Sequence, residues 1–134
     1  MPPRPPVPDA PVERIRVKRI YRAARISDGR RILVDRLWPR GMAKERARLF
    51  DWCKDIAPSE ALRHWFHADP GRWEDFATRY EAELADRDAL VRTLAGHARE
   101  GVVTLLYAAR DEEHNNAVVL RGYLRRWLEG EACA

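Results

Sequence analysis

Val103-Thr104-Leu105-Leu106-Tyr107-Ala108-Ala109 is a near-continuous apolar run, and it leads directly into Arg110-Asp111-Glu112-Glu113-His114-Asn115-Asn116. Its length and its β-branched and aromatic members are typical of a strand buried on both faces, the kind found in parallel sheets covered by helices. The polar segment then falls at the carboxyl end of this strand, the edge where open α/β sheets generally bind their ligands. This stretch therefore predicts both the fold class and the edge of the sheet that would carry a site.

Two further strands are predicted earlier in the chain. Residues 12–21 alternate between apolar and basic side chains, and residues 31–37 form a largely apolar run. Pro39 ends the second run, because proline cannot donate to a ladder of hydrogen bonds. Residues 44–54 are predicted to be helical or irregular. Helical spacing of apolar side chains predicts the remaining elements, which are helices over 60–66, over 70–84, from Asp86 or Asp88 to Gly101, and over 115–129.

The order of these elements predicts an α/β protein, a small three-layer sandwich whose short, mostly parallel sheet is flanked by helices. The connection between the strands over 31–37 and 102–109 is long and helical, so we expect these two strands to pair in parallel. Their carboxyl ends would then share one edge of the sheet. Residues 36–41 are therefore expected to converge on residues 110–115.

Length and composition fit one folded domain. The chain has 134 residues, of which 46% are hydrophobic and 34% are charged. Residues 1–11 are rich in proline and are predicted to be a disordered leader, followed by a single domain over residues 12–130. Cys53 and Cys133 are too few and too far apart for a disulfide scaffold. Because neither a signal peptide nor a run of about 20 apolar residues occurs, we expect a cytoplasmic protein without a membrane partner.

Basic residues are concentrated in the first part of the chain. The net charge at pH 7 is +4, and residues 1–31 carry nine Lys or Arg against three Asp or Glu. Such a surplus is consistent with a surface that binds phosphates. It is equally consistent with a solvated strand edge, where charge prevents unwanted pairing. Both interpretations stay open at this stage.

The two segments at the predicted edge carry the candidate site residues. A guanidinium group presents a planar fork of donors suited to carboxylate or phosphate, and an indole ring can stack on a planar ligand. Trp65 is a second candidate for such stacking. The start of the helix over 115–129 also favours an anion. The predicted substrate-binding residues are Arg36, Trp38, Arg40, Arg63, Arg110 and Asn115.

His114 and Asp111 are the predicted catalytic pair. An imidazole titrates near neutrality, so His114 is a candidate general acid or base that Asp111 would orient. The structural alternative is that Asp111 or Asn115 caps the helix, and the two roles are compatible. No metal is expected, because His67, His114 and Asp111 offer no closely spaced pair of ligands. No cofactor is expected either, since the chain has no glycine-rich phosphate loop and no dinucleotide fingerprint.

Four blocks of the sequence together resemble a known family. They are Val34-Asp35-Arg36-Leu37-Trp38-Pro39-Arg40-Gly41; Ala57-Pro58-Ser59 with Leu62-Arg63-x-Trp65-Phe66; Asp69-Pro70 with Trp73, Phe76, Tyr80, Glu83 and Leu84; and the run from Thr104 to Asp111 with His114-Asn115. They look like the signature of the bacterial YeaO-like proteins, domain-of-unknown-function family 488, over residues 13–128. The resemblance implies a small α/β domain and a cytoplasmic bacterial protein, but no reaction. That family usually has lysine at position 110 and often histidine at position 116, so Asn116 is not predicted to be catalytic.

Three functions remain open from the sequence. The first is an enzyme or ligand-binding protein that acts on an anionic, phosphate- or nucleotide-like small molecule at the carboxyl edge of the sheet. The second is a protein-interaction or accessory domain without catalysis, whose arginines form structural ion pairs. The third is a nucleic-acid-binding module that uses the basic first third and exposed tryptophans. The sequence sets neither the ligand nor the oligomeric state.

Overall fold

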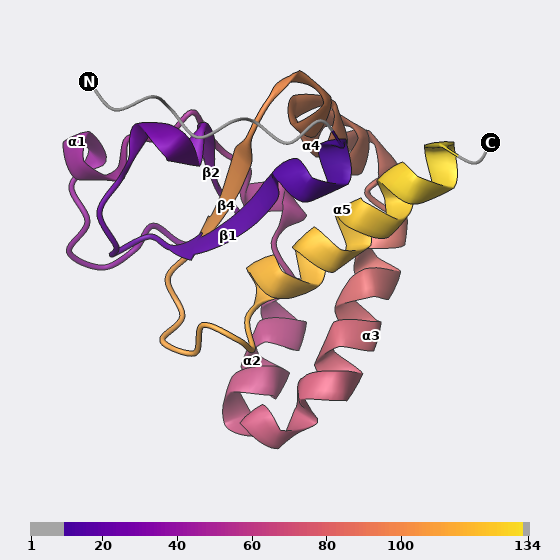
Figure 1. Cartoon of the computed structure of the whole chain (residues 1–134). Helices are drawn as coiled ribbons and strands as arrows, with labels where there is room; N and C mark the ends of the chain where they lie inside the picture. Colours follow the sequence, from indigo (N-terminus) through magenta and orange to yellow (C-terminus); the bar gives the residue numbers. More distant parts are fainter. Residues whose placement is uncertain (1–9, 133–134) are drawn as a thin grey trace.

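The computed structural model describes residues 10–132, and Figure 1 shows their arrangement. Most of the predicted leader, residues 1–9, lies outside the described residues. Within them, one sheet is formed by β1 (Ile15–Arg19), β2 (Arg30–Leu33), β3 (Asp51–Trp52) and β4 (Val103–Tyr107). The α-helices are α1 (Lys44–Ala47), α2 (Glu60–Ala68), α3 (Trp73–Ala85), α4 (Asp88–Glu100) and α5 (Asn116–Ala132). Short 3-10 turns are η1 (Pro11–Arg14), η2 (Ile26–Asp28), η3 (Lys54–Ile56) and η4 (Pro70–Arg72).

All strands of the sheet run parallel, which confirms the predicted fold class. The strand order is β1-β4-β2-β3, so β4 lies inside the sheet, and each of its residues is buried. β2 pairs with β4 in parallel, as the long helical connection predicted, with Ile32 opposite Leu105. β1 is an edge strand, so its basic side chains fit the strand-edge interpretation of the charge-rich first third.

The sheet departs from the sequence prediction at two places. β2 ends at Leu33, earlier than the strand predicted over 31–37, because the Asp35 carboxylate accepts the N–H of Ala108 at 2.9 Å in place of a backbone carbonyl. β3 was not predicted. The segment 44–54 contains α1, then Arg48 in a left-handed conformation with φ of 47°, and then a strand of two residues. So short a strand shows no alternation of side chains, and only its pairing with β2 reveals it.

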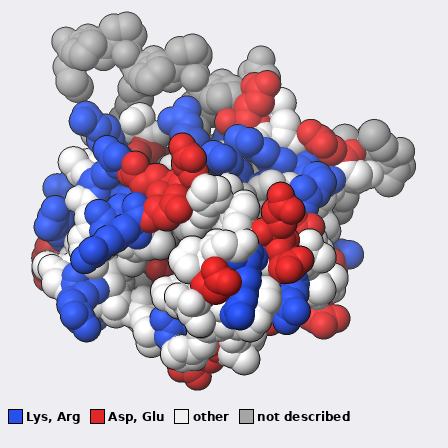
Figure 2. All heavy atoms as spheres, turned by 90° about the horizontal axis from the view of Figure 1, so that it is seen from below, with Lys and Arg blue, Asp and Glu red and all other residues white. Residues whose placement is uncertain are grey.

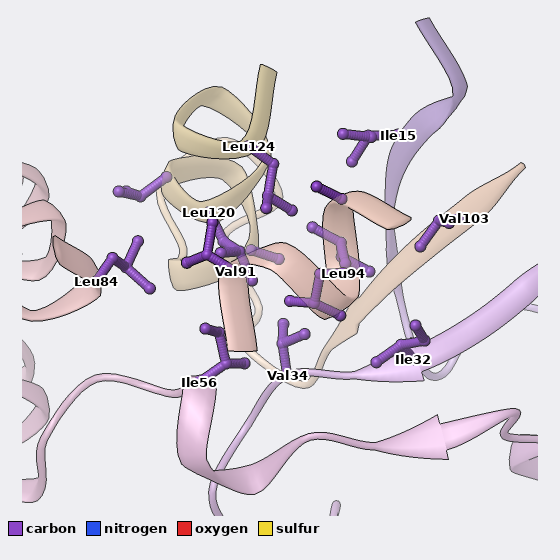
Figure 3. Close-up of a cluster of buried hydrophobic side chains, with 14 of the residues drawn as sticks. Ile15, Ile32, Val34, Ile56, Leu84, Val91, Leu94, Val103, Leu120 and Leu124 are labelled. Carbon is purple, nitrogen blue, oxygen red and sulfur yellow. The ribbon is translucent and has the colours of Figure 1, made fainter. Parts of the chain in front are cut away.

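Two unequal hydrophobic clusters cover the faces of the sheet. The larger lies between the sheet and helices α2 to α5, and Figure 3 shows Val34, which follows β2, near Leu94 of α4. The smaller cluster includes Leu106 of β4 and Ala47 of α1. The predicted layers are therefore present but unequal, and the carboxyl edge of the sheet is left to the loops after β2 and β4. No helix among residues 10–132 is both long and apolar enough to span a bilayer.

Candidate functional site

A pocket of about 460 Å³ opens where β1, β2 and β4 end. Its walls come mainly from three segments far apart in the sequence, which are residues 35–40 after β2, residues 57–67 at α2, and residues 108–116 before α5. The convergence of the first and last of these, expected from parallel pairing, is confirmed. Small-molecule sites occupy roughly 300–1,000 Å³, so the pocket has the size of a ligand site.

The predicted site residues gather around this pocket with one exception. His114 lines it, whereas Asp111 does not. The predicted substrate-binding residues all line it, namely Arg36, Trp38, Arg40, Arg63, Arg110 and Asn115. The roles assigned to these side chains stay predictions, since the structure gives their position alone. Trp65 is not a lining residue; its ring contacts the guanidinium groups of Arg72 and Arg79, 4.8 and 4.2 Å from its centroid.

Five arginines line the pocket without a carboxylate partner. Within residues 10–132, no ion pair is made by the side chains of Arg19, Arg36, Arg40, Arg63 and Arg110. Elsewhere on the molecule Arg22, Arg30 and Arg31 each lie 2.6 Å from a carboxylate oxygen. The Nε atom of Arg36 is also buried without a hydrogen-bond acceptor. A buried donor without a partner is costly, so an acceptor supplied by a ligand would remove that cost.

His114 and Asp111 form a hydrogen-bonded pair at the pocket. Nδ1 of His114 lies 3.0 Å from Oδ2 of Asp111, while Oδ1 of Asp111 accepts the backbone N–H groups of Glu113 and His114 at 2.9 and 3.0 Å. The hydrogen bond from Glu113, followed by that from the His114 ring, lowers the pKa of Asp111. The ring of His114 also meets Trp73 edge to face, with centroids 4.9 Å apart. Because Asp111 occupies Nδ1, Nε2 is the ring nitrogen left for a ligand.

Asn115 caps α5, which confirms the structural alternative for this residue. Its Oδ1 accepts the N–H of Val118 at 3.1 Å, and its Nδ2 donates to the carbonyl of Asp111 at 3.0 Å. The side chain is buried, with 2% exposure. Both ends of the amide are thus used within the protein, so Asn115 serves as a fixed part of the wall. Its predicted contact with a ligand stays a prediction.

Trp38 is likewise held by the protein. Its Nε1 donates to the carbonyl of Met42 at 2.8 Å, and its ring meets that of Trp52 edge to face, with centroids 5.3 Å apart. The ring packs against the smaller hydrophobic cluster and still lines the pocket. Trp38 therefore presents a rigid apolar surface to the cavity.

Asp35 and Asn116 also line the pocket, and the sequence analysis did not place either among the site residues. The Asp35 carboxylate accepts hydrogen bonds from the N–H of Ala108 at 2.9 Å and from Nδ2 of Asn116 at 3.1 Å. Burial raises the pKa of Asp35, although these hydrogen bonds and the charges of Arg63 and His67 oppose the change. Asp35 was missed because it fell inside a predicted strand. An acidic residue that follows a buried apolar run was the available signal.

The position of α2 depends on a contact with α3. Ser59 caps α2, and its Oγ accepts the N–H of Leu62 at 3.2 Å. The acidic partner that a capping box would supply locally comes instead from Glu83 of α3. Its carboxylate accepts the N–H and Oγ–H of Ser59 at 2.8 and 2.6 Å. This contact holds the helix that carries Arg63, one of the arginines of the pocket.

Comparison with known proteins tests the family resemblance. A family model described as "Inactive DUF488-N3 subclade" matches residues 14–134. The chain belongs to the DUF488 family. An uncharacterised protein of Mycobacterium tuberculosis (strain ATCC 25618 / H37Rv) is 46% identical over 109 residues, which cover 80% of this chain and 90% of that protein. The uncharacterised protein YeaO of Escherichia coli K12 is 45% identical over 111 residues, which cover 83% of this chain and 96% of YeaO. No solved structure matches this DUF488 chain at a significant level.

The described part of this DUF488 chain contains no metal-binding cluster of the common kind. Among residues 10–132, no group of three or more His, Cys, Asp or Glu side chains is arranged to hold a metal ion. His67 and His114 both line the pocket, but no acidic side chain completes a ligand set with them. The polar side-chain groups that line the pocket are guanidinium, imidazole, amide, carboxylate and phenol groups.

Proposed function

We propose that this protein binds an anionic, phosphate- or nucleotide-like small molecule in the pocket at the carboxyl edge of the sheet. The observation that carries the proposal is the set of arginines that line this pocket without ion pairs. Guanidinium groups that converge on a cavity with low-dielectric walls create a positive potential there, and an anion offsets it. Planar forks of N–H donors also match the oxygens of phosphate and carboxylate.

The apolar part of the lining supports an organic ligand over a bare inorganic ion. Phe66 and Phe76 stack with centroids 4.4 Å apart, and both line the pocket with Pro58. Typical small-molecule sites combine such apolar walls with a few polar groups that fix the orientation of the ligand. A phosphate group on a flat organic body would use both kinds of surface.

Binding without turnover is the form of the proposal that the family comparison supports, since the matching model is described as an inactive subclade. Catalysis is the second candidate. The 3.0 Å contact between His114 and Asp111 favours it, because a carboxylate at Nδ1 fixes the tautomer that a general base needs. This candidate predicts turnover of a bound phosphate ester, and it predicts that His114→Ala abolishes turnover.

The other two functions receive less support. Several basic side chains of the first third are engaged within the protein, as Lys18 and Arg31 are with Asp28. Figure 2 shows the molecule from below relative to Figure 1, and acidic side chains lie among the Lys and Arg side chains on that face. A nucleic-acid-binding surface would be more uniformly basic. An accessory domain with structurally paired arginines would not leave five of them without carboxylates around one cavity.

The test is a binding measurement on the full chain by titration calorimetry and by thermal unfolding. Phenyl phosphate and adenosine 5′-monophosphate are the probes, with uncharged phenol as the reference compound. A ligand that binds the folded state stabilises it by about 2.7 kcal/mol at a hundredfold excess over Kd. We expect both phosphates, and not phenol, to raise the unfolding midpoint.

Two pocket variants and one control complete this test. We expect Arg40→Ala and Arg63→Ala to weaken phosphate binding about tenfold each, because each removes charge-assisted hydrogen bonds. Arg92→Ala is the matched control, since Arg92 is exposed on α4, contacts Asp88 at 2.8 Å and does not line the pocket. The proposal is wrong if neither phosphate binds, or if all three variants bind phosphate as the unmodified protein does.

A further inference from the structure

Asp35 stands out among the residues that line the pocket. In the described part of the chain it is the one acidic side chain of the lining, and it faces a cavity that five arginines otherwise make positive. It pairs with none of them, and no ion pair joins it to His67. A largely buried carboxylate that lacks an ion pair is unfavourable unless hydrogen-bond donors surround it.

The donors that Asp35 receives from the protein leave it incompletely satisfied. A carboxylate offers about four acceptor positions. Two hydrogen bonds from the protein occupy part of them, those from the N–H of Ala108 and from Nδ2 of Asn116. Nδ2 of Asn116 also donates to the carbonyl of Val34 at 3.0 Å, so both of its hydrogens are used and its Oδ1 is left as an acceptor. Asp35 and Asn116 thus form an acceptor-rich part of the pocket lining.

An anion held by the arginines would also interact with these acceptors of Asp35 and Asn116. A ligand with acceptors or a second charge near Asp35 would be repelled. A ligand with N–H donors there would instead gain hydrogen bonds to a charged acceptor, which are stronger than neutral ones. The lining therefore combines cationic donors with one anionic acceptor, and a ligand that satisfies both carries an anionic group together with N–H donors.

We propose that Asp35 determines specificity by selecting organic anions that also carry N–H donors. The class includes aromatic amines and nitrogen heterocycles that bear a phosphate or carboxylate. This proposal rests on the proposed function and adds the identity of a second polar group of the ligand. The competing explanation is that Asp35 only fastens the end of β2 to the chain after β4.

The experiment compares ligands that differ in one substituent. Aminophenyl phosphate presents a donor and nitrophenyl phosphate presents acceptors on the same ring, and phenyl phosphate is the unsubstituted reference. Both the 3- and the 4-substituted compounds are titrated, so that reach alone does not decide the result. With the unmodified protein we expect the better amino compound to bind about tenfold or more tightly than its nitro counterpart, as a hydrogen bond to a charged acceptor implies.

The variant Asp35→Asn separates ligand recognition by Asp35 from its structural role in holding the end of β2 to the chain after β4. The amide keeps an oxygen for the N–H of Ala108 but removes the charge and places an NH₂ group in the pocket, so we expect the amino preference to fall to about twofold or less. Phenyl phosphate should bind the variant at least as tightly as it binds the unmodified protein. Asp55→Asn is the control, because Asp55 is exposed in η3 and does not line the pocket.

The outcomes are distinguishable. If no phosphate binds the unmodified protein, both the proposed function and this inference are wrong. If phosphates bind but the amino and nitro compounds bind equally, the inference about Asp35 fails while the proposed function stands. If Asp35→Asn weakens all phosphates by the same factor, Asp35 has a fastening role only. Should the variant not fold, the comparison of ligands on the unmodified protein still decides the matter.

Discussion

Glu83→Ala is expected to loosen α2 and the wall of the pocket that it forms. The Glu83 carboxylate accepts hydrogen bonds from N and Oγ of Ser59 at 2.8 and 2.6 Å, and Arg87 lies 3.6 Å away. Hydrogen bonds to charged groups contribute about 1.5–3 kcal/mol each, and solvent reduces this because the Glu83 side chain is 27% exposed. We expect the free energy of unfolding to fall by about 2 kcal/mol, which corresponds to a decrease of about 4–8 °C in Tm.

The assay is thermal unfolding of Glu83→Ala beside Glu81→Ala. Both replacements remove a glutamate from α3, but Glu81 makes an ion pair of 2.9 Å with Arg126 that is largely exposed. Exposed ion pairs contribute about 0–1 kcal/mol, so Glu81→Ala should change Tm little. Because α2 carries Arg63, Glu83→Ala should also weaken phosphate binding where Glu81→Ala does not. Equal midpoints for the two variants would refute the argument that Glu83 positions α2.

Two further changes test the fold around the site. Gly29→Ala should destabilise the protein by about 2–4 kcal/mol in chemical denaturation, because Gly29 has φ of 63° and a Cβ atom there would lie 2.2 Å from the carbonyl oxygen of Val102. Gly41→Ala, at φ of 73° in open space, should cost only about 1–2 kcal/mol, and a larger loss than at Gly29 would contradict this account. For Asp35, the raised native pKa means that the folded state holds the proton more tightly than the unfolded state. Its stabilising contribution is therefore full below the ordinary value of 3.8 and is lost as pH rises through the native pKa. Denaturation at several pH values should show this decline in the stability of the unmodified protein relative to Asp35→Asn, because the lowered pKa values of Asp28 and Asp111 act alike in both; a rise over that window relative to the variant would show the sign to be wrong.

Local patterns were sufficient for most of the elements and for the place of the site. The strand β4 is buried along its whole length, and the cap at Asn115 forms as its sequence position indicates. Parallel pairing of β2 with β4 followed from the long helical connection, and it brought Arg40 and His114 to one pocket. These features were predictable because strand and helix periodicity depend on short stretches of chain. Parallel pairing was predictable because a long helical connection is the usual link between parallel strands.

Contacts between distant residues set the rest. Asp35 ends β2 by accepting a hydrogen bond from Ala108, 73 positions away in the sequence, and Glu83 supports Ser59 across 24 positions. The strand β3 exists only through its partner β2. Whether an arginine is paired or left facing a cavity depends equally on which carboxylates the fold brings near it. Such pairings depend on how the helices and strands pack together, so no local pattern in the sequence predicts them.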